Sequence, residues 1–401
     1  LSKGTPLPDP VVIGTSGRIA PAVDVITRSE RPVNLQQVPG VFNPDNDGID
    51  FYESLEGMLV TAEDTVAVSA TRTFNSFSSE LFTLTNDGAN IAPPDARTAR
   101  GGINLQPDPN NMGDQNPERV QIQFDPTVSG GAGVPAITVN DLLDSVTGVM
   151  GYSFGNFEVN ALAPFSVTPG GPDLETTSLV GTRDEIVVAS YNVLNLDATS
   201  ADDAQRATVA GHIADNIGSP DVIAVQEIQD DNGTVDDGTT DATQTLQLLV
   251  DAIAAAGGPS YEFFDVAPEN NTSGGAPGGN IRNAFLYDAD RVKLVDYDSL
   301  TPEVLGEIGV SDPDAFAGTR NPLLATFKFR GKEVTVINNH LTSRFGSTPV
   351  FGGPQPFVQA GEAERGAQTA ALNEVVDAIV AGATGDATHA SKSGRVIVAG
   401  D

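Results

Sequence analysis

Hydrophobic and polar residues follow two different patterns along this 401-residue chain, and the pattern changes after about residue 165. Before that point, apolar and β-branched residues come in short runs separated by segments rich in Pro, Gly, Asn and Asp. Such runs predict strands, and short strands at this spacing favour a small barrel or sandwich. We therefore expect a β-rich domain, with its clearest strands at residues 11–13, 59–61, 65–68, 81–84 and 120–124.

From residue 185 the pattern predicts alternating strands and helices. Residues 202–217 carry apolar side chains at helical spacing, and the segments 243–256 and 361–381 are also predicted to be helical. This alternation favours helices packed on a mixed sheet, and thus an α+β chain. Residues 166–184, which are rich in Pro and Gly, predict a linker. The predicted strands of this second part are 186–191, 222–225, 261–266, 284–287, 292–297, 323–329, 334–340 and 396–399.

Composition excludes several classes of site. The chain has no cysteine, so it has no disulfide, no thiolate metal site and no cysteine nucleophile. It has 54 acidic and 21 basic residues, a net charge of −33, which argues against tight nucleic-acid binding by electrostatics alone. Solubility in a salty medium explains this charge, and a surface that stores cations is the alternative. No run of apolar residues is long enough for a membrane span.

Four polar residues lie where predicted strands end, which is where open α/β sheets place their sites. Asn192 and Glu227 follow the first two strands of the second part, and His340 and Asp401 end two later ones. Each of them alone is compatible with a turn former, a solvated carboxylate or a structural histidine. Together at strand ends, they indicate a site.

The sequence around these positions resembles a known motif series. The segments Ser190–Asn195, Pro220–Glu227, Asn339–Arg344 and Val398–Asp401 are similar, in order, to motifs of the endonuclease/exonuclease/phosphatase (deoxyribonuclease I-like) superfamily. Further segments resemble its branch of large bacterial extracellular nucleases. These are residues 278–287, 318–327 and 50–60.

The resemblance implies an architecture. We expect an OB-fold-like β-rich domain over residues 1–165, a linker over 166–184, and an incomplete four-layer α/β sandwich over 185–401. In the superfamily, the Gly-Asp motif is followed by an Asn two positions later and by a late Asp-His pair. This sequence has none of these, and His212 and His389 do not replace them. We therefore expect a C-terminally truncated, inactive piece of an active protein.

The resemblance also implies a chemistry, hydrolysis of a phosphodiester with Mg²⁺ or Mn²⁺. It assigns metal binding to Glu227, with Asn192 positioning a metal water or phosphate oxygen and Asp401 orienting the metal or nucleophile. His340 would give a hydrogen bond or proton to the phosphate or leaving group. We name Arg282 and Arg344 as candidate phosphate contacts, because guanidinium groups match phosphate oxygens; surface ion pairs are the alternative. The implied protein is a secreted or cell-surface nuclease, monomeric, acting on DNA, with RNA left open.

Other interpretations remain open. The acidic loop 230–238 invites a structural Ca²⁺, but it lacks the EF-hand spacing, and a solvated turn is the alternative. A sphingomyelinase-like phosphodiesterase or a phosphatase would use the same chemistry; Phe345 and Phe351 are its only hints of a membrane-docking hairpin. A protein of another class, a non-catalytic acidic surface or matrix protein, is the third hypothesis.

Overall fold

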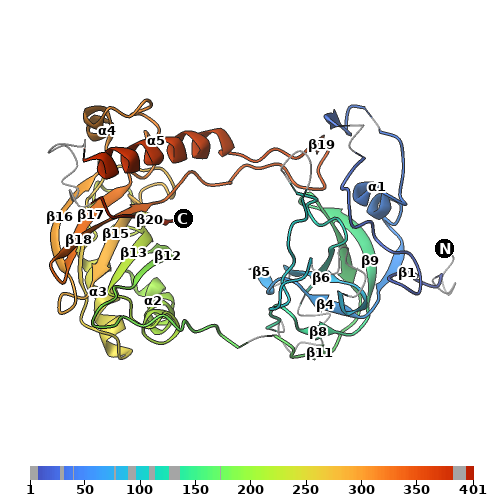
Figure 1. Cartoon of the computed structure of the whole chain (residues 1–401). Coiled ribbons are helices and arrows are strands. Elements are labelled where there is room, and N and C mark those ends of the chain that lie inside the picture. Colours follow the sequence, from blue (N-terminus) through green and yellow to red (C-terminus); the bar gives the residue numbers. More distant parts are fainter. Residues whose placement is uncertain are drawn as a thin grey trace. The chain divides into compact units, whose positions relative to one another are not determined.

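A computed structural model describes residues 8–27, 31–38, 40–75, 78–88, 96–107, 113–125, 136–171, 173–382 and 394–401. The chain folds as two compact units, coloured along the sequence in Figure 1. Unit 1 contains residues 1–173 and 345–360, and unit 2 contains residues 174–344 and 361–401. His389 lies outside the described residues.

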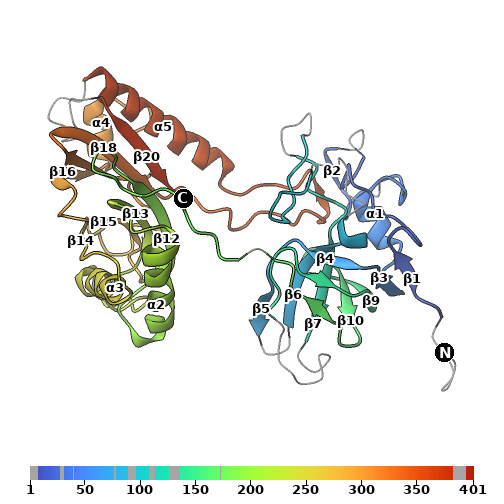
Figure 2. The same cartoon turned by 60° about the horizontal axis from the view of Figure 1, so that its bottom comes forward.

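Unit 1 is built on one mixed sheet of ten strands, most of which are labelled in Figure 2. Strands β1 and β3, and strands β7 and β10, pair in parallel, and the other pairs are antiparallel. In spatial order the sheet runs β1 (Val11–Ile13), β3 (Leu59–Ala62), β9 (Val146–Ser153), β10 (Asn156–Ala161), β7 (Val120–Phe124), β6 (Ser78–Leu84), β4 (Thr65–Ala67), β8 (Leu142–Leu143) and β11 (Val167–Thr168), with β5 (Arg72–Asn75) beside β6.

Alternating side chains of this sheet form the core of unit 1. Val60 and Ala62 of β3 are fully buried while their neighbours are not, as expected for a strand with one face against the core. The short helix α1 (Gly48–Glu53) adds Phe51 and Tyr52 to the same cluster. A 3₁₀ turn, η2 (Asn86–Gly88), follows β6.

Residues 345–360 belong to unit 1, whereas the sequence analysis placed them in the second domain. Strand β19 (Pro354–Gln355) pairs with β2 (Val33–Asn34), and Phe351 is only 5% exposed. The Phe351 ring lies 5.8 Å from that of Tyr52 and 6.1 Å from that of Phe157. Burial of this apolar side chain in the aromatic core explains the assignment.

Unit 2 contains two four-stranded sheets. The first runs β12 (Val188–Leu196), β13 (Val222–Ile228), β15 (Arg282–Tyr287) and β14 (Glu262–Asp265). The second runs β16 (Lys293–Ser299), β17 (Leu323–Phe329), β18 (Lys332–Asn339) and β20 (Val396–Gly400). The helices are α2 (Asp203–Gly211), α3 (Thr243–Ala255), α4 (Pro302–Ile308) and α5 (Glu362–Ala381), with η3 (Ser200–Asp202) before α2 and a π-helical turn η4 (His212–Asn216) after it.

Three core clusters order these elements into layers. Strand β13 is buried on both faces, which is why its sequence is a continuous apolar run. Ile223 and Val225 pack with α2 and α3, whereas Val222 and Ala224 pack with Phe327 and Val336 of the second sheet. The other face of that second sheet packs on α4 and α5. The order is therefore helices, sheet, sheet, helices.

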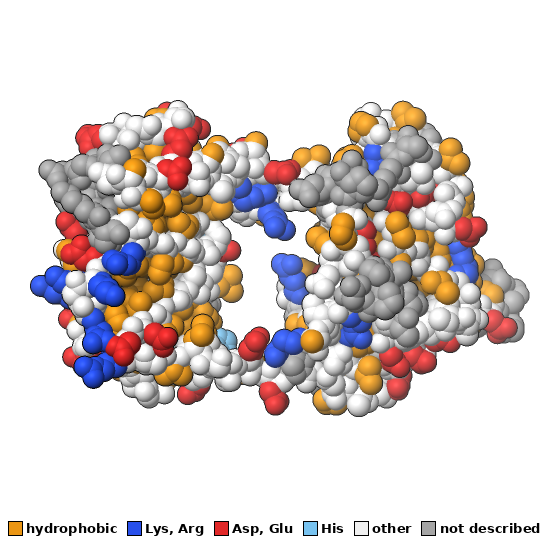
Figure 3. Space-filling view, in the orientation of Figure 1, with side chains coloured by type: hydrophobic (Ala, Val, Ile, Leu, Met, Phe, Trp, Pro, Cys, Tyr) orange, Lys and Arg blue, Asp and Glu red, His pale blue; other side chains and the backbone are white. Residues whose placement is uncertain are grey.

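On the face seen in Figure 3, acidic side chains lie on both units rather than in a single patch. This distribution fits the strongly negative net charge of the whole chain. Within the described part of the chain, no helix is long and apolar enough to cross a bilayer.

Candidate active site

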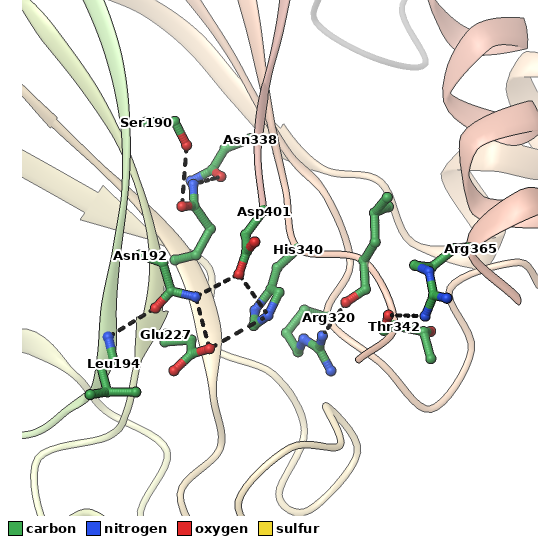
Figure 4. A network of polar contacts seen from close by, with 12 residues as sticks. Ser190, Asn192, Leu194, Glu227, Arg320, Asn338, His340, Thr342, Arg365 and Asp401 are labelled. Carbon is green, nitrogen blue, oxygen red and sulfur yellow. Dashed lines mark hydrogen bonds and ion pairs between the residues drawn. The ribbon is translucent and has the colours of Figure 1, made fainter. Parts of the chain in front are cut away.

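The carboxyl ends of four strands of unit 2 bring polar residues together. Strands β12 and β13 are parallel, and so are β18 and β20, so within each pair the carboxyl ends point the same way. Asn192 lies in β12 and Glu227 in β13, while His340 and Asp401 directly follow β18 and β20. Figure 4 shows these four side chains facing one another.

Two of these strands, β12 and β13, have irregular backbone beside their site residues. Glu227 has a φ of +64°, and the pairing of β13 with β15 shifts register around it, between Val225 and Ile228. The pairing of β12 with β13 shifts between Asn192 and Leu196. Such bulges re-aim side chains, and a left-handed residue other than glycine costs about 1–3 kcal/mol that the surroundings must offset. Strain at an acidic residue in this position is typical of functional sites.

The Asn192 side chain lies between two carboxylates. Its Nδ2 donates to Glu227 Oε1 at 2.8 Å and to Asp401 Oδ2 at 2.7 Å. Its Oδ1 accepts from the Leu194 backbone N–H at 2.9 Å. These hydrogen bonds hold the two carboxylates beside the amide. The role of Asn192 as a metal ligand stays a prediction.

Glu227, His340 and Asp401 form a group that could hold a cation. One potential ligand atom of each lies within 4.8 Å of the others. His340 Nε2 is 3.7 Å from Glu227 Oε1 and 3.9 Å from Asp401 Oδ2. Glu227 Oε2 is buried and has no hydrogen-bond partner among the described residues. Two carboxylates with a spare buried oxygen are a donor set that suits a hard cation such as Mg²⁺ or Mn²⁺.

The imidazole of His340 is held mainly in its neutral form. Burial lowers its pKa below the ordinary value, and the Arg320 guanidinium lowers it further, while Glu227 and Asp401 oppose both effects. A neutral imidazole carries one N–H donor and one acceptor. His340 can therefore donate one hydrogen bond to a substrate oxygen, and its neutral ring does not repel a bound cation.

A buried polar brace beneath the site joins the two sheets. Gln226 Nε2 donates to Asn338 Oδ1 at 2.6 Å, and Asn338 Nδ2 donates to the carbonyl oxygens of Val225 and Ala284 at 2.9 and 2.8 Å. Because both side chains are nearly fully buried, each of these hydrogen bonds must be made for the strands to stay together. The brace fixes β13 against β18, and thus Glu227 against His340.

Sequence analysis missed one cation beside the site. Arg320 is 6% exposed, donates from Nη2 to the Leu341 carbonyl oxygen at 2.7 Å, and lies next to His340 in Figure 4. Burial lowers its pKa, and the charges of Glu227 and Asp401 raise it. Its position gave no periodic signal, since Arg320 lies outside every strand and helix of unit 2.

The two predicted phosphate contacts lie in different surroundings. Arg282 is 3% exposed, and its Nη1 pairs with Asp265 Oδ2 at 2.9 Å, so it is not a surface ion pair. Arg344 is exposed in the segment after His340, at the end of this part of unit 2. Contact of either guanidinium with a phosphate stays a prediction.

The acidic loop 230–238 uses its carboxylates as hydrogen-bond acceptors. Asp230 accepts from Asn280 Nδ2 at 2.9 Å, Asp231 accepts from the Thr245 N–H at 2.8 Å, and Asp237 accepts from the Thr239 N–H at 3.0 Å. Of the residues that the structure describes, only Glu227, His340 and Asp401 form a group with metal-holding geometry. A structural Ca²⁺ in this loop stays a prediction.

One family model matches part of the chain. Residues 12–169 match a family described as a domain of unknown function (DUF8508). No curated protein matches the chain.

Several solved structures resemble about half of the chain. TDP2 from D. rerio complexed with a single-strand DNA product is 20% identical, with a TM-score of 0.30 over 54% of this chain and 60% of that one. The human Nocturnin catalytic domain with bound sulfate is 17% identical, with a TM-score of 0.31 over 54% and 64%. A β-hairpin deletion mutant of β toxin from Staphylococcus aureus is 14% identical, with a TM-score of 0.32 over 54% and 66%.

These likenesses concern structure alone. They are to members of the deoxyribonuclease I-like superfamily, and this chain spans less than two thirds of the length of each of the three. At these identities and TM-scores, any argument about chemistry depends on the arrangement of Asn192, Glu227, His340 and Asp401.

Proposed function

We propose that this chain carries catalytic residues of a secreted, metal-dependent phosphodiester hydrolase that acts on nucleic acid. The observation that supports the proposal most directly is the meeting of Glu227, His340 and Asp401 within 4.8 Å at the ends of parallel strands. The proposal takes unit 2 as a deoxyribonuclease I-like sandwich and unit 1 as an OB-like accessory domain.

Each residue has a role that its surroundings support. Glu227 and Asp401 would hold Mg²⁺ or Mn²⁺, with Asn192 keeping their oxygens in place through its shared amide group. The cation, when bound, would neutralise charge on the phosphate and help to position an attacking water. His340 would donate a hydrogen bond to a phosphate oxygen from its neutral ring. The Arg320 guanidinium adds positive charge beside the site.

Positive charge at the site would also offset the repulsion between this acidic chain and a nucleic acid. A chain with a net charge of −33 repels a polyanion, so long-range attraction cannot bring DNA to it. A bound cation and a buried arginine supply positive charge at short range, where screening by salt is weaker. We expect binding and turnover to depend strictly on the metal for this reason.

The experiment is a plasmid-nicking assay with the full-length protein, in Mg²⁺ and in EDTA. Glu227→Gln should lower the nicking rate about 100-fold or more, because it removes a carboxylate that holds the cation. Glu307→Gln, an exposed change on α4, is the matched control and should leave the rate unchanged. Nicking that persists in EDTA would contradict the proposal.

Assays of the same protein on other phosphoesters distinguish the alternative functions. Turnover of sphingomyelin or a phosphomonoester without nicking of DNA would favour a lipid phosphodiesterase or phosphatase. Phe351 gives that alternative no support, since its ring is buried in unit 1. Absence of turnover on every phosphoester would favour the non-catalytic acidic protein.

A further inference from the structure

A cavity of about 370 Å³ lies wholly within unit 1, where helix α1, strands β9 and β10 and residues 351–353 meet. Four aromatic side chains line it, those of Phe42, Tyr152, Phe157 and Phe351. Its volume is in the range of small-ligand pockets, whose walls are mostly apolar with a few polar groups. The cavity is separate from the proposed catalytic group, which belongs to unit 2.

Two of these aromatic rings are open to solvent, so a ligand can contact them. Phe42 is 59% exposed and Tyr152 is 43% exposed, whereas Phe157 and Phe351 are almost fully buried. The exposed rings therefore lie at the mouth of the cavity, and the buried rings form its base. Large rings exposed together at the mouth of a cavity are typical of a surface that binds a ligand.

The aromatic wall is held in place before any ligand binds. The Tyr152 hydroxyl donates to the Phe351 carbonyl oxygen at 3.1 Å, and the Tyr152 ring lies 4.8 Å from that of Phe157. On the other side of the wall, the backbone N–H of Leu35 donates to the Gly353 carbonyl oxygen at 2.8 Å. Such preorganisation lowers the entropic cost of binding.

The charged side chains of the cavity wall are both acidic. Asp50 and Glu53 of α1 line the cavity, and none of its described lining residues is basic. Glu53 is exposed, and its carboxylate has no hydrogen-bond or ion-pair partner in the described part of the chain. Partial burial raises the pKa of Glu53, and the charges of Glu56 and Asp50 raise it further. A bound cation would relieve this repulsion among carboxylates.

Aromatic rings beside carboxylates favour an organic cation with a methylated nitrogen. Ring faces attract a cation within about 6 Å of their centre, and cages of aromatic rings recognise quaternary ammonium groups. Such a group presents methyl groups and has no N–H donor, so it enters an apolar wall at little cost. A primary ammonium is strongly hydrated and brings three donors that need acceptors.

We propose that this cavity of unit 1 binds a small quaternary ammonium cation, with Phe42 and Tyr152 as its aromatic contacts and Glu53 as its counter-charge. The proposal goes beyond phosphodiester hydrolysis and does not rest on it, because every residue that carries it lies in unit 1. The occupant carries no phosphate near its nitrogen, since a phosphate would be repelled by Asp50 and Glu53. A free cation such as choline fits this description, whereas a phosphocholine headgroup does not.

The test is a ligand-observed NMR titration of the 401-residue chain at low salt in EDTA, which keeps divalent metal ions off the carboxylates. The probes are choline and its neutral isostere, in which a carbon atom replaces the nitrogen. Choline should bind about tenfold more tightly than the isostere, because only the cation is attracted by the rings and the carboxylates. Equal binding of the two probes would overturn the assignment to a cation.

A substitution at the mouth of the cavity tests the aromatic contact. Phe42→Leu keeps an apolar side chain and removes the ring, so it should weaken choline binding about threefold to thirtyfold. Phe74→Leu is the matched control, because Phe74 is also an exposed ring of unit 1 but does not line the cavity. It should leave choline binding unchanged.

A second substitution tests the counter-charge. Glu53→Gln keeps the shape of the side chain and should weaken choline binding about twofold to fivefold at low salt, while the neutral isostere binds as before. Asp144→Asn is the control, since this carboxylate is exposed on unit 1 outside the cavity. Choline binding that is unchanged in Phe42→Leu or in Glu53→Gln would overturn the proposed site.

Other probes distinguish the possible sources of the cation. Phosphocholine, and vesicles of phosphatidylcholine in a sedimentation assay, should bind more weakly than choline because their phosphate lies near the carboxylates. Tighter binding of either would overturn the assignment to a free cation, and ethanolamine that binds as tightly as choline would overturn the preference for a methylated nitrogen. None of these measurements depends on hydrolysis, so failure of the proposed function would show separately.

Discussion

Asn192 and Asp401 are 209 positions apart in sequence, and their side chains are hydrogen-bonded at 2.7 Å. The same Nδ2 atom donates to Glu227, so a single neutral amide lies between two carboxylates. Like charges at this separation repel, and a cation is the partner that would turn this repulsion into attraction. Asn192 therefore preorganises a cation site, because it fixes the two carboxylates that would bind the ion.

Asn192→Ala should weaken Mn²⁺ binding about 10- to 100-fold, because the carboxylates lose the group that orients them. Isothermal titration of the 401-residue chain with Mn²⁺ measures the change. Gln247→Ala, on the exposed face of α3, is the control and should bind Mn²⁺ like the parent chain. Equal affinities in Asn192→Ala and the control would show that the amide does not organise the site.

Metal binding should also stabilise unit 2, because a ligand that binds only the folded chain raises the free energy of unfolding by RT ln(1 + [L]/Kd). At 100 times the Kd this amounts to about 2.7 kcal/mol. Mn²⁺ should thus raise the melting temperature of the parent chain, and not that of Glu227→Gln or Asp401→Asn. A rise that survives both substitutions would place the cation elsewhere.

The alternation of strands and helices in unit 2 could be predicted because apolar residues recur along each of these segments at the spacing of a strand or a helix. The run Val222–Val225 is apolar on both faces, and α3 begins at Thr243 as its pattern predicts. Helix α4 was missed, although Thr301 caps its N-terminus and Gly309 ends it in the left-handed conformation, because seven residues are too few to show a stripe. The placement of residues 345–360 in unit 1 depends on tertiary packing alone.

The residues of the candidate site could be predicted from the sequence, but the arrangement of their side chains could not. Strand ends marked Glu227 and His340, since polar residues there interrupt apolar runs. The bulge that gives Glu227 a φ of +64° has no signature in the sequence, so the direction of its side chain could not be foreseen. Arg320 reaches the site through its contact with Leu341, 21 positions later in the chain, and a local pattern does not reveal such a contact.

Unit 1 should be more stable in mild acid than in base because of Glu118. Its side chain is 4% exposed, and burial raises its pKa from 4.5 to about 7, with a smaller contribution from Asp114 and opposition from Arg119. The folded state thus holds the proton more tightly than the unfolded state. The resulting stabilisation, of order 3 kcal/mol, is complete below pH 4.5 and is lost as the pH rises through about 7.

Glu118→Gln should remove this pH dependence, because an amide does not ionise. Hydrogen exchange of the β7 amides, corrected for intrinsic rates, measures the local free energy of opening at pH 5 and pH 8. We expect that free energy to fall between the two pH values in the parent chain and to change much less in the variant. Parallel pH profiles for the two proteins would rule out Glu118 as the source.

Phe351→Ala tests whether residues 345–360 are part of unit 1. The Phe351 ring packs on Tyr52 and Phe157, and the Tyr152 hydroxyl donates to its carbonyl oxygen at 3.1 Å. Removing a buried ring from such a cluster costs about 3–5 kcal/mol, so unit 1 should melt at a lower temperature while unit 2 is unaffected. Phe345→Ala is the matched control, since that ring is 95% exposed and its loss should change stability by about 0.5 kcal/mol or less. If hydrogen exchange in unit 1 responds equally to both substitutions, or to neither, the segment is not packed in the core of that unit.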